Sequence, residues 1–342
     1  MKVLQSPYSY GPNSPIPKNY YLAGFIVGLL LFLLYVQIQE QFNNKVMFRA
    51  EVEKRTKVPV IAEIVQSPNK DNIAIRDGKR TVIAEQFRAL RTNLAFMGFN
   101  ENNKTLLVTS SISGEGKSFV AINLAISITL TGKTVALMEM DLRKPKLSQQ
   151  LGVDKNPGIS SYLVNKATIE QICKKTEFEG LSVVSAGPIP PNPTELIQLP
   201  EFKTMMDELS ARYDYVIIDT APIGPVTDAQ LLAQYVHTSI YVVRHDKTPS
   251  NFINLIDTLH RDKKFPGMCI VFNGIKPRGV NLLGYGFGGY GNGYGYGYGY
   301  GYGYGYGYGS DTYGYYTNDE KHPGFKNLWG FRKGLKRLFK KR

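Results

Sequence analysis

Short apolar runs alternate with helix-length segments between residues 106 and 273 of this 342-residue chain. The runs are Leu106–Thr109, Thr134–Met140, Leu181–Ser185, Tyr215–Asp219, Ile240–Arg244 and Met268–Asn273. Runs of this length, separated by segments long enough to return as helices, are typical of buried parallel strands. The pattern predicts an α/β domain with a mostly parallel, doubly wound sheet. Ligands of such sheets bind beyond the carboxyl ends of the strands.

A longer apolar stretch lies near the N-terminus. The 21 residues from Asn19 to Gln39 carry no charge and lie between Lys18 and Glu40. At about 1.5 Å per residue, a helix of this length spans roughly the 30 Å hydrocarbon core of a bilayer. A signal peptide would show a cleavage site of small residues, and none is present here. The stretch therefore predicts a transmembrane helix over residues 20–39.

The charges that flank this stretch are unequal. Lys2 and Lys18 precede it, whereas five basic residues follow it within about 20 residues. These five are Lys45, Arg49, Lys54, Arg55 and Lys57. The excess of positive charge marks the cytoplasmic side of a span. We therefore expect the sheet domain to be cytoplasmic.

The segment from Thr81 to Met97 has the pattern of an amphipathic helix. Its apolar seam consists of Ile83, Phe87, Leu90, Leu94 and Met97, at helical spacing. Glu85, Arg88 and Arg91 recur every three residues beside this seam. One interpretation is a solvated face with local Glu–Arg pairs, and the other is a contact between subunits. The pattern alone does not choose between them.

These patterns divide the chain into six segments. We expect a Pro-rich extracytoplasmic segment (1–19), a transmembrane helix (20–39), a juxtamembrane connector (40–80), a cytoplasmic sheet domain (81–280), a Gly/Tyr-rich tail (281–320) and a basic amphipathic C-terminus (321–342).

The first apolar run of the sheet domain is followed by a glycine-bearing loop. The loop reads SISGEGKS over residues 111–118, and a helix-like segment follows it. A strand, a glycine-bearing loop and a helix in this order are the setting of a phosphate loop, whose backbone N–H groups surround an anion. Lys117 would reach the β- and γ-phosphates of a nucleotide, and Ser118 would ligate Mg²⁺.

The loop departs from G-x-x-x-x-G-K-[ST] at one position, because Ser111 stands where the first glycine belongs. The strand and helix around it favour a nucleotide site over an accidental turn. Ile112 stands where partition and septum-positioning ATPases carry an additional signature lysine. Its absence argues against that class of ATPase.

Polar side chains lie at or just after the ends of other apolar runs. Asp219 is placed to support Mg²⁺, and Glu139 and Asp141 add carboxylates at the same predicted edge. One of this pair would hold metal and the other would accept a hydroxyl proton, and the sequence does not say which. Arg143 would offset charge on the transferred group, unless it is an ordinary surface arginine.

The net charge of +13 is concentrated at the C-terminus. The last 18 residues hold eight Lys or Arg and no acid, so the other 324 residues carry only +5. This distribution does not indicate nucleic-acid binding by the body of the protein. Basic and apolar residues interleave in the last segment, which predicts an interfacial helix on membrane lipids rather than a solvated tail. The two cysteines, Cys173 and Cys269, have no metal-type spacing.

Residues 284–316 are almost an alternation of glycine and tyrosine, a composition that does not sustain a packed core. This predicts a flexible array of phenol groups near an ATP site. The 13 tyrosines are Tyr285, Tyr290, Tyr294, Tyr296, Tyr298, Tyr300, Tyr302, Tyr304, Tyr306, Tyr308, Tyr313, Tyr315 and Tyr316.

In combination, these motifs resemble those of the bacterial tyrosine kinases of the exopolysaccharide and capsule co-polymerase family. The resemblance rests on SSISGEGKS, LMEMDLRKP, YVIIDTAP, the tyrosine-rich tail and the helix motif ExxRxxRxNL that begins at Glu85. It implies a membrane-anchored, ATP- and Mg²⁺-dependent protein-tyrosine kinase with a P-loop NTPase-like fold. It also implies phosphorylation of the tail in trans within a ring, expected to be an octamer, in the bacterial inner membrane.

The resemblance assigns roles to individual residues. It implies nucleotide binding by Ser113, Gly114, Glu115, Gly116, Lys117, Ser118 and Phe119, and adenine recognition near Asn273. It implies Mg²⁺ support from Ser118, Asp141 and Asp219, catalysis by Lys117, Glu139, Asp141, Arg143 and Asp219, and ring assembly through Glu85, Arg88 and Arg91. The implied partners are other copies of the chain, the polysaccharide polymerisation and export machinery and a tyrosine phosphatase.

Two features depart from the family pattern. The paired acids of the family are usually both aspartate, whereas Glu139 occupies the first position here. The first membrane span and extracytoplasmic domain of the family are absent from this sequence, so we expect either a fragment or a separate sensor protein. The alternatives to a kinase are a regulatory ATPase without a protein acceptor and a nucleotide-bound scaffold.

Overall fold

The computed structural model describes residues 17–41, 44–67, 72–76, 81–224 and 227–276. The Gly/Tyr-rich tail with its 13 tyrosines, the basic C-terminus and most of the Pro-rich segment lie outside the described residues.

Eight strands form one sheet in the order β1-β8-β7-β2-β6-β3-β5-β4. They are β1 (Val60–Val65), β2 (Thr105–Ser110), β3 (Val135–Met140), β4 (Cys173–Lys175), β5 (Leu181–Val184), β6 (Tyr215–Thr220), β7 (Thr238–Arg244) and β8 (Met268–Ile275). Neighbouring strands are parallel except for the edge pair of β4 and β5. β2 lies between β6 and β7, so the loop that follows β2 opens at the middle of the carboxyl edge.

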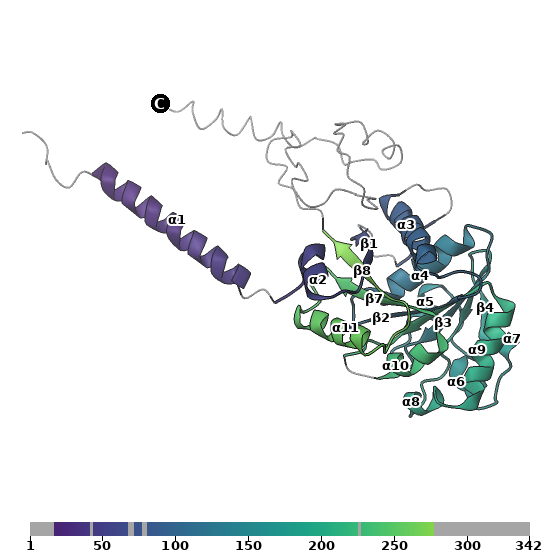
Figure 1. The fold of residues 1–342 in the computed structure, drawn as a ribbon. Coiled ribbons are helices and arrows are strands. Elements are labelled where there is room, and N and C mark those ends of the chain that lie inside the picture. The colour runs from purple at the N-terminus through teal and green to yellow at the C-terminus, as the bar shows by residue number, and fades with distance from the viewer. Residues whose placement is uncertain (1–16, 42–43, 68–71, 77–80, 225–226, 277–342) are drawn as a thin grey trace, which may run out of the picture.

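Helices cover both faces of the sheet (Figure 1). The longer ones are α3 (Val82–Phe96), α4 (Lys117–Thr129), α9 (Pro200–Arg212) and α11 (Asn251–Arg261). The shorter ones are α2 (Arg49–Arg55), α5 (Leu147–Gln150), α6 (Ile159–Leu163), α7 (Ile169–Ile172), α8 (Pro193–Leu196), α10 (Asp228–Leu232) and the 3₁₀ turn η1 (Ala233–Tyr235). The apolar seams of α3 and α4 bury one face, and α9, α10 and α11 bury the other. The strands between these layers are almost wholly apolar because both of their faces are buried.

The sheet confirms the α/β prediction, and all six apolar runs form strands. The structure adds two edge strands that the sequence did not predict. β1 lies inside the segment expected to be a connector, and its pairing with β8 places it within the sheet. The sheet domain therefore begins before residue 81. β4 is three residues long, too short to give a periodic signal.

One helix near the N-terminus, α1 (Pro17–Gln41), contains the predicted apolar stretch. Within the described residues it is the one helix long and apolar enough to cross a membrane, judged by length and composition. Its side chains from Asn19 to Ile38 are exposed. A helix with exposed apolar side chains on all sides has the character of a membrane span.

Candidate active site

The loop between β2 and α4 turns sharply at two glycines just before α4 begins. Gly114 and Gly116 have positive φ angles of 82° and 97°, which glycine adopts without strain. A Cβ at Gly116 would lie 2.1 Å from the amide nitrogen of Asn273. Ser111 is not among the described residues with positive φ, so its position does not require the glycine of the usual motif. The loop therefore keeps glycine where the backbone needs it.

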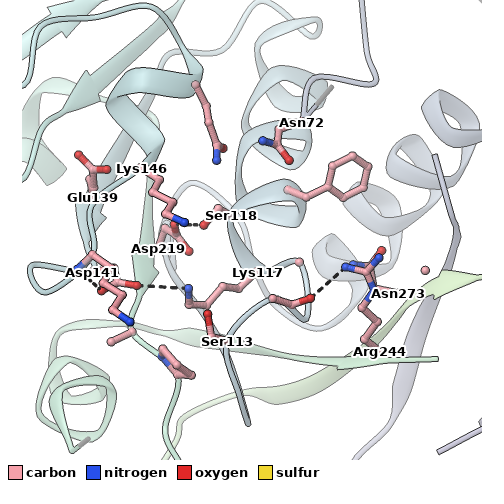
Figure 2. A pocket seen from close by; sticks show the side chains of 18 of the residues that line it. Asn72, Ser113, Lys117, Ser118, Glu139, Asp141, Lys146, Asp219, Arg244 and Asn273 are labelled. Carbon is pink, nitrogen blue, oxygen red and sulfur yellow. Dashed lines mark hydrogen bonds and ion pairs between the residues drawn. The ribbon is translucent and has the colours of Figure 1, made fainter. Parts of the chain in front are cut away.

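Four predicted site residues come together at the carboxyl edge of the sheet (Figure 2). Lys117 Nζ lies 3.5 Å from Asp141 Oδ2. The hydroxyl of Ser118 donates to Asp219 Oδ2 at 2.6 Å. All four residues line a cavity of about 800 Å³, together with Ser113, Gly114, Gly116, Phe119 and Asn273. The structure thus brings most of the predicted site into one cleft.

Asp219 is the most perturbed acid in this cleft. It is 2% exposed, and burial raises its pKa from 3.8 to about 6, against the lowering effects of Lys117 and Ser118. Its second oxygen, Oδ1, is buried without a hydrogen-bond partner. A buried carboxylate oxygen without a donor is costly unless a ligand satisfies it. The site therefore has the character of a place for a cation.

A divalent cation fits these residues. Mg²⁺ in nucleotide sites is held by one or two protein oxygens together with phosphate oxygens and water. Ser118 and Asp219 offer such oxygens, and Asp141 lies beside them across Lys117. Across the described part of the chain, no group of three or more His, Cys, Asp or Glu forms a metal site. The residues present therefore suit a nucleotide-bound metal rather than a metal held by protein alone.

Glu139 borders the cavity, but its carboxylate is occupied. Oε1 accepts the backbone N–H groups of Leu147 (2.6 Å) and Ser148 (3.3 Å) at the start of α5. Oε2 accepts the Ser148 hydroxyl and the backbone N–H of Ala186 (3.2 Å). Glu139 thus ties β3 to α5 and to the end of β5.

Glu115 also differs from its expected role, because its side chain lies outside the cavity lining. Its carboxylate accepts the backbone N–H of Ile112 at 2.8 Å and the hydroxyl of Thr248. Burial raises its pKa, while these bonds act in the opposite direction. Asn273 supports the loop as well, since its amide donates to the carbonyl of Glu115 at 2.8 Å. The side chains of Glu115 and Asn273 thus both hydrogen-bond to backbone groups of the phosphate loop.

Arg143 is tied to a buried acid. Its Nε lies 3.2 Å from Asp228 Oδ2, and its Nη2 donates to the Thr194 hydroxyl at 3.3 Å. Asp228 also accepts the Thr194 hydroxyl, at 2.8 Å. Arg143 still lines the cavity, so this network sets the direction from which it approaches the site.

Several lining residues were not predicted from the sequence. They are Val65, Gln66, Ser67, Asn72, Lys144, Lys146, Gln150, Ala221, Pro222, Arg244 and Gly274. Arg244 ends β7 and donates to the carbonyl of Gly114 at 2.9 Å. The strand-end rule that selected Asn273 would also have selected Arg244. No such signal marks Asn72, which lies in a segment without regular structure.

The segment that follows α1 contacts the loop after β7. Val46 donates its backbone N–H to Thr248 at 2.9 Å and accepts from Asp246 at 3.0 Å. Asp246 also pairs with Lys45 (3.3 Å) and Lys276 (2.8 Å), which lowers its pKa. The hydroxyl of Thr248 donates to Glu115 in the phosphate loop. Val46, which follows α1, is therefore connected to that loop by hydrogen bonds through Thr248 and Glu115.

The predicted oligomerisation residues have different surroundings. Glu85 and Arg88 form an ion pair with each other on the outer surface of α3. Arg91 donates to the backbone carbonyl of Ser127 in α4, and burial lowers its pKa. Arg91 is thus committed to its own subunit, whereas the Glu85–Arg88 pair faces outward.

The sequence of the chain is similar to those of known proteins. Residues 103–258 match the profile of a family described as an AAA domain. The chain is 38% identical over 173 residues to the putative tyrosine-protein kinase CapB of Staphylococcus aureus, covering 51% of this chain and 76% of CapB. It is 31% identical over 253 residues to the tyrosine-protein kinase ptk of Acinetobacter johnsonii, covering 70% of this chain and 34% of that relative. The chain thus spans most of one relative and about a third of the other.

A solved structure of similar fold is the kinase domain of the Escherichia coli tyrosine kinase ETK. It superimposes with a TM-score of 0.61 at 25% identity, and the match covers 71% of this chain and all of that domain. The fold of that kinase domain is therefore matched along its whole length by part of this chain.

Proposed function

The chain belongs to the family of bacterial tyrosine-protein kinases, and from this premise we propose that it transfers the γ-phosphoryl group of ATP to tyrosines. The observation that carries the proposal is the meeting of Lys117, Ser118, Asp141 and Asp219 at one cleft, with an unpartnered oxygen on Asp219. Phosphoryl transfer depends mostly on positioning and charge neutralisation, which these groups supply.

Each residue has a distinct role in this proposal. The loop N–H groups and Lys117 bind the β- and γ-phosphates, and Ser118 and Asp219 hold Mg²⁺, which neutralises phosphate charge when bound. Asp141 accepts the proton of the tyrosine hydroxyl, because the carboxylate of Glu139 already accepts four donors. Arg143, oriented by Asp228, offsets charge on the transferred group.

We propose the 13 tyrosines between residues 285 and 316 as the acceptors, phosphorylated in trans by a neighbouring copy. The test is to incubate the full chain in detergent with ATP and Mg²⁺ and to map phosphotyrosine by mass spectrometry. Phosphate on several tail tyrosines is the expected result. ATP hydrolysis with bare tyrosines would instead indicate a regulatory ATPase, and neither activity would indicate a scaffold.

Transfer in trans has its own test. A Lys117→Met chain that keeps its tail is mixed with an active chain whose 13 tail tyrosines are replaced by phenylalanine. Phosphate on the Lys117→Met chain shows transfer between copies. If phosphotyrosine appears only in the unmodified chain, which carries both Lys117 and the tail tyrosines, transfer occurs within one chain.

We also propose that copies assemble into a ring, an octamer by family resemblance, through Glu85 and Arg88. Arg88→Ala is expected to reduce the oligomer to smaller species with little change in melting temperature, because an exposed ion pair stabilises a helix by only about 0.3–0.5 kcal/mol. Light scattering coupled to size-exclusion chromatography measures the change.

Two variants control this measurement. Arg261→Ala removes a comparable exposed pair with Asp257 on α11 and should leave the oligomer intact. Arg91→Ala is expected to lower the melting temperature, because it removes the bond to the Ser127 carbonyl. An unchanged oligomer in Arg88→Ala would refute the assignment.

The location and biological role follow from the same premise. We propose that α1 crosses the bacterial inner membrane once with the kinase domain in the cytoplasm, a location that cell fractionation tests. The proposed role is the control of exopolysaccharide or capsule polymerisation and export, opposed by a tyrosine phosphatase. Full phosphorylation of 13 tyrosines adds roughly −20 to −26 charges, enough to outweigh the net +13 of the chain. Such charge would disperse the ring, so phosphatase treatment should enlarge the oligomer.

A further inference from the structure

Asn123 is a buried asparagine of α4 that the chemistry above leaves without a role. Its side chain is 0% exposed. The amide nitrogen donates to the carbonyls of Asn72 (2.7 Å) and Phe119 (2.8 Å). The amide oxygen accepts the backbone N–H groups of Ala74 (2.7 Å) and Ile75 (3.2 Å). The two donors and two acceptor positions of an asparagine side chain are thus all used.

Three of these four bonds hold one segment, residues 72–76, which has no regular secondary structure. Backbone groups of such a segment need partners from outside it when they are buried. Ile75 is buried in the core beneath the segment, and Asn72 lines the cavity. The place of Asn72 at the cavity therefore depends on Asn123, which itself is not part of the cavity lining.

Asn72 lines the cavity at a place apart from Asp141 (Figure 2). In Figure 2, Arg244 and Asn273 lie to the right of Lys117 and Asp141 lies to its left, while Asp219 lies above the ammonium group of Lys117 and Asn72 lies above and to the right of it. If the terminal phosphates lie at Lys117 and Asp141, the base and ribose of the nucleotide extend toward Asn72. This step rests on the function proposed above.

An asparagine side chain is suited to adenine. Its amide offers one donor and one acceptor side by side, which match the N6 amino group and a neighbouring ring nitrogen of adenine. Guanine carries the acceptor O6 where adenine has its amino group, so the same amide orientation would place two acceptors together. An asparagine held in one place can therefore distinguish the two bases.

We propose that Asn72 contacts the adenine base and determines nucleotide specificity, and that Asn123 is the positioning residue that holds Asn72 in place. Asn123 acts through the backbone of residues 72–75 and touches no part of the nucleotide. Asn72 accepts the hydrogen bond from Asn123 through its backbone carbonyl. A substitution of the Asn72 side chain therefore leaves this hydrogen bond intact.

The test compares Asn72→Ala and Asn123→Ala with the unmodified full chain in detergent. Binding of ADP, GDP and inorganic pyrophosphate, each with Mg²⁺, is measured by calorimetry. We expect ADP affinity to fall about tenfold in both variants, as for the loss of one or two hydrogen bonds. GDP and pyrophosphate affinities should change less than twofold, so the preference for ADP over GDP falls. With ATP, KM should rise while kcat stays within twofold.

Further variants separate positioning from general stability. Gln171→Ala removes an amide-to-backbone bond to Thr168 near α7, outside the cavity lining, and should leave all three affinities unchanged. Asn123→Asp keeps the acceptors for Ala74 and Ile75 but places a carboxylate oxygen against the carbonyls of Asn72 and Phe119, so it should lower ADP affinity at least as much as Asn123→Ala. Melting temperatures establish that each variant is folded.

Two results would overturn the inference. Unchanged ADP affinity in Asn72→Ala would show that the Asn72 side chain does not contact the base. The backbone bond to Asn123 is kept in this variant, so the result would report on the side chain alone. Equal losses of ADP and pyrophosphate affinity in Asn123→Ala would show that Asn123 supports the whole site. Failure of the unmodified chain to bind ADP would instead refute the proposed ATP site, and the inference with it.

Discussion

Lys117→Met is expected to lower tyrosine phosphorylation by roughly 10²- to 10³-fold, the usual cost of removing one group that stabilises transition-state charge. Lys117 begins α4, is 8% exposed and points its ammonium group toward Asp141 across the cleft. Methionine keeps the length of the side chain and removes its charge. Phosphotyrosine in the tail, quantified by mass spectrometry after incubation with ATP and Mg²⁺, measures the effect.

Lys264→Met is the matched control, because it removes an exposed lysine after α11 and should leave phosphorylation unchanged. A melting curve of Lys117→Met excludes unfolding as the cause of any loss. Phosphorylation of Lys117→Met at the rate of the unmodified chain would refute the placement of the terminal phosphates at this loop. In that case the phosphates would have to bind elsewhere in the cleft.

Asp219→Asn is expected to abolish activity and at the same time to stabilise the nucleotide-free protein at neutral pH. The activity is lost because a neutral amide is a poor ligand for Mg²⁺. The stability rises because the folded protein raises the pKa of Asp219 from 3.8 to about 6. A raised carboxyl pKa means that folding disfavours the charged form. Each pKa unit corresponds to about 1.36 kcal/mol, so the cost at pH 7 is about 1–3 kcal/mol.

The pH dependence gives the sign of this effect a direct test. Below about pH 4 the carboxyl group is protonated in both the folded and the unfolded chain, and it carries no cost. Between about pH 4 and pH 6 the unfolded chain loses the proton of Asp219 while the folded protein keeps it, so the free energy of unfolding falls as pH rises. Above about pH 6 the carboxyl group is ionised in both states, and the cost stays constant. The difference in melting temperature between Asp219→Asn and the unmodified chain should therefore be largest above pH 6 and vanish near pH 4.

Two comparisons make the Asp219 result specific. Asp262→Asn removes the same unit of charge from an exposed position and should change neither activity nor stability appreciably. ATP with Mg²⁺ should raise the melting temperature of the unmodified chain much more than that of Asp219→Asn. Lower stability of Asp219→Asn at pH 7.5 would show that the carboxylate is satisfied in the folded protein.

Much of the fold could be predicted because burial leaves a local record in the sequence. A strand buried on both faces must be apolar along its length, as β2 and β3 are. The seam of α3 at helical spacing matches its buried residues Ile83, Phe87, Leu90 and Leu94. The edge strand β1 was missed because it lies apart from the other apolar runs, in the segment expected to be a connector. The edge strand β4 was missed because it is only three residues long.

Much of the candidate site could also be predicted, since it follows from one topological rule. The carboxyl ends of parallel strands meet at one edge, so residues that end different strands become neighbours. Ser118 follows the loop after β2 and Asp219 lies near the end of the neighbouring strand β6, so the two form a hydrogen bond although they are 101 positions apart. The rule places a residue at the edge, but it does not give the direction of the side chain.

The direction of each side chain was decided by partners that the sequence does not reveal. Glu139 and Asp141 are two residues apart, yet the donors of α5 and Ala186 engage Glu139 while Asp141 faces Lys117. Arg88 and Arg91 share a motif, yet the carbonyl of Ser127 holds only Arg91.

The sequence by itself determined the parallel sheet, the phosphate loop, the strand-end acids and the apolar helix near the N-terminus. These depend on local patterns of polarity and on glycine. Only the tertiary structure decided which acid faces Lys117, what supports the loop and how residues 72–76 reach the cavity. Hydrogen bonds are directional and join groups far apart in the chain, such as Asn123 and Ala74 at 49 positions, so no local pattern encodes them.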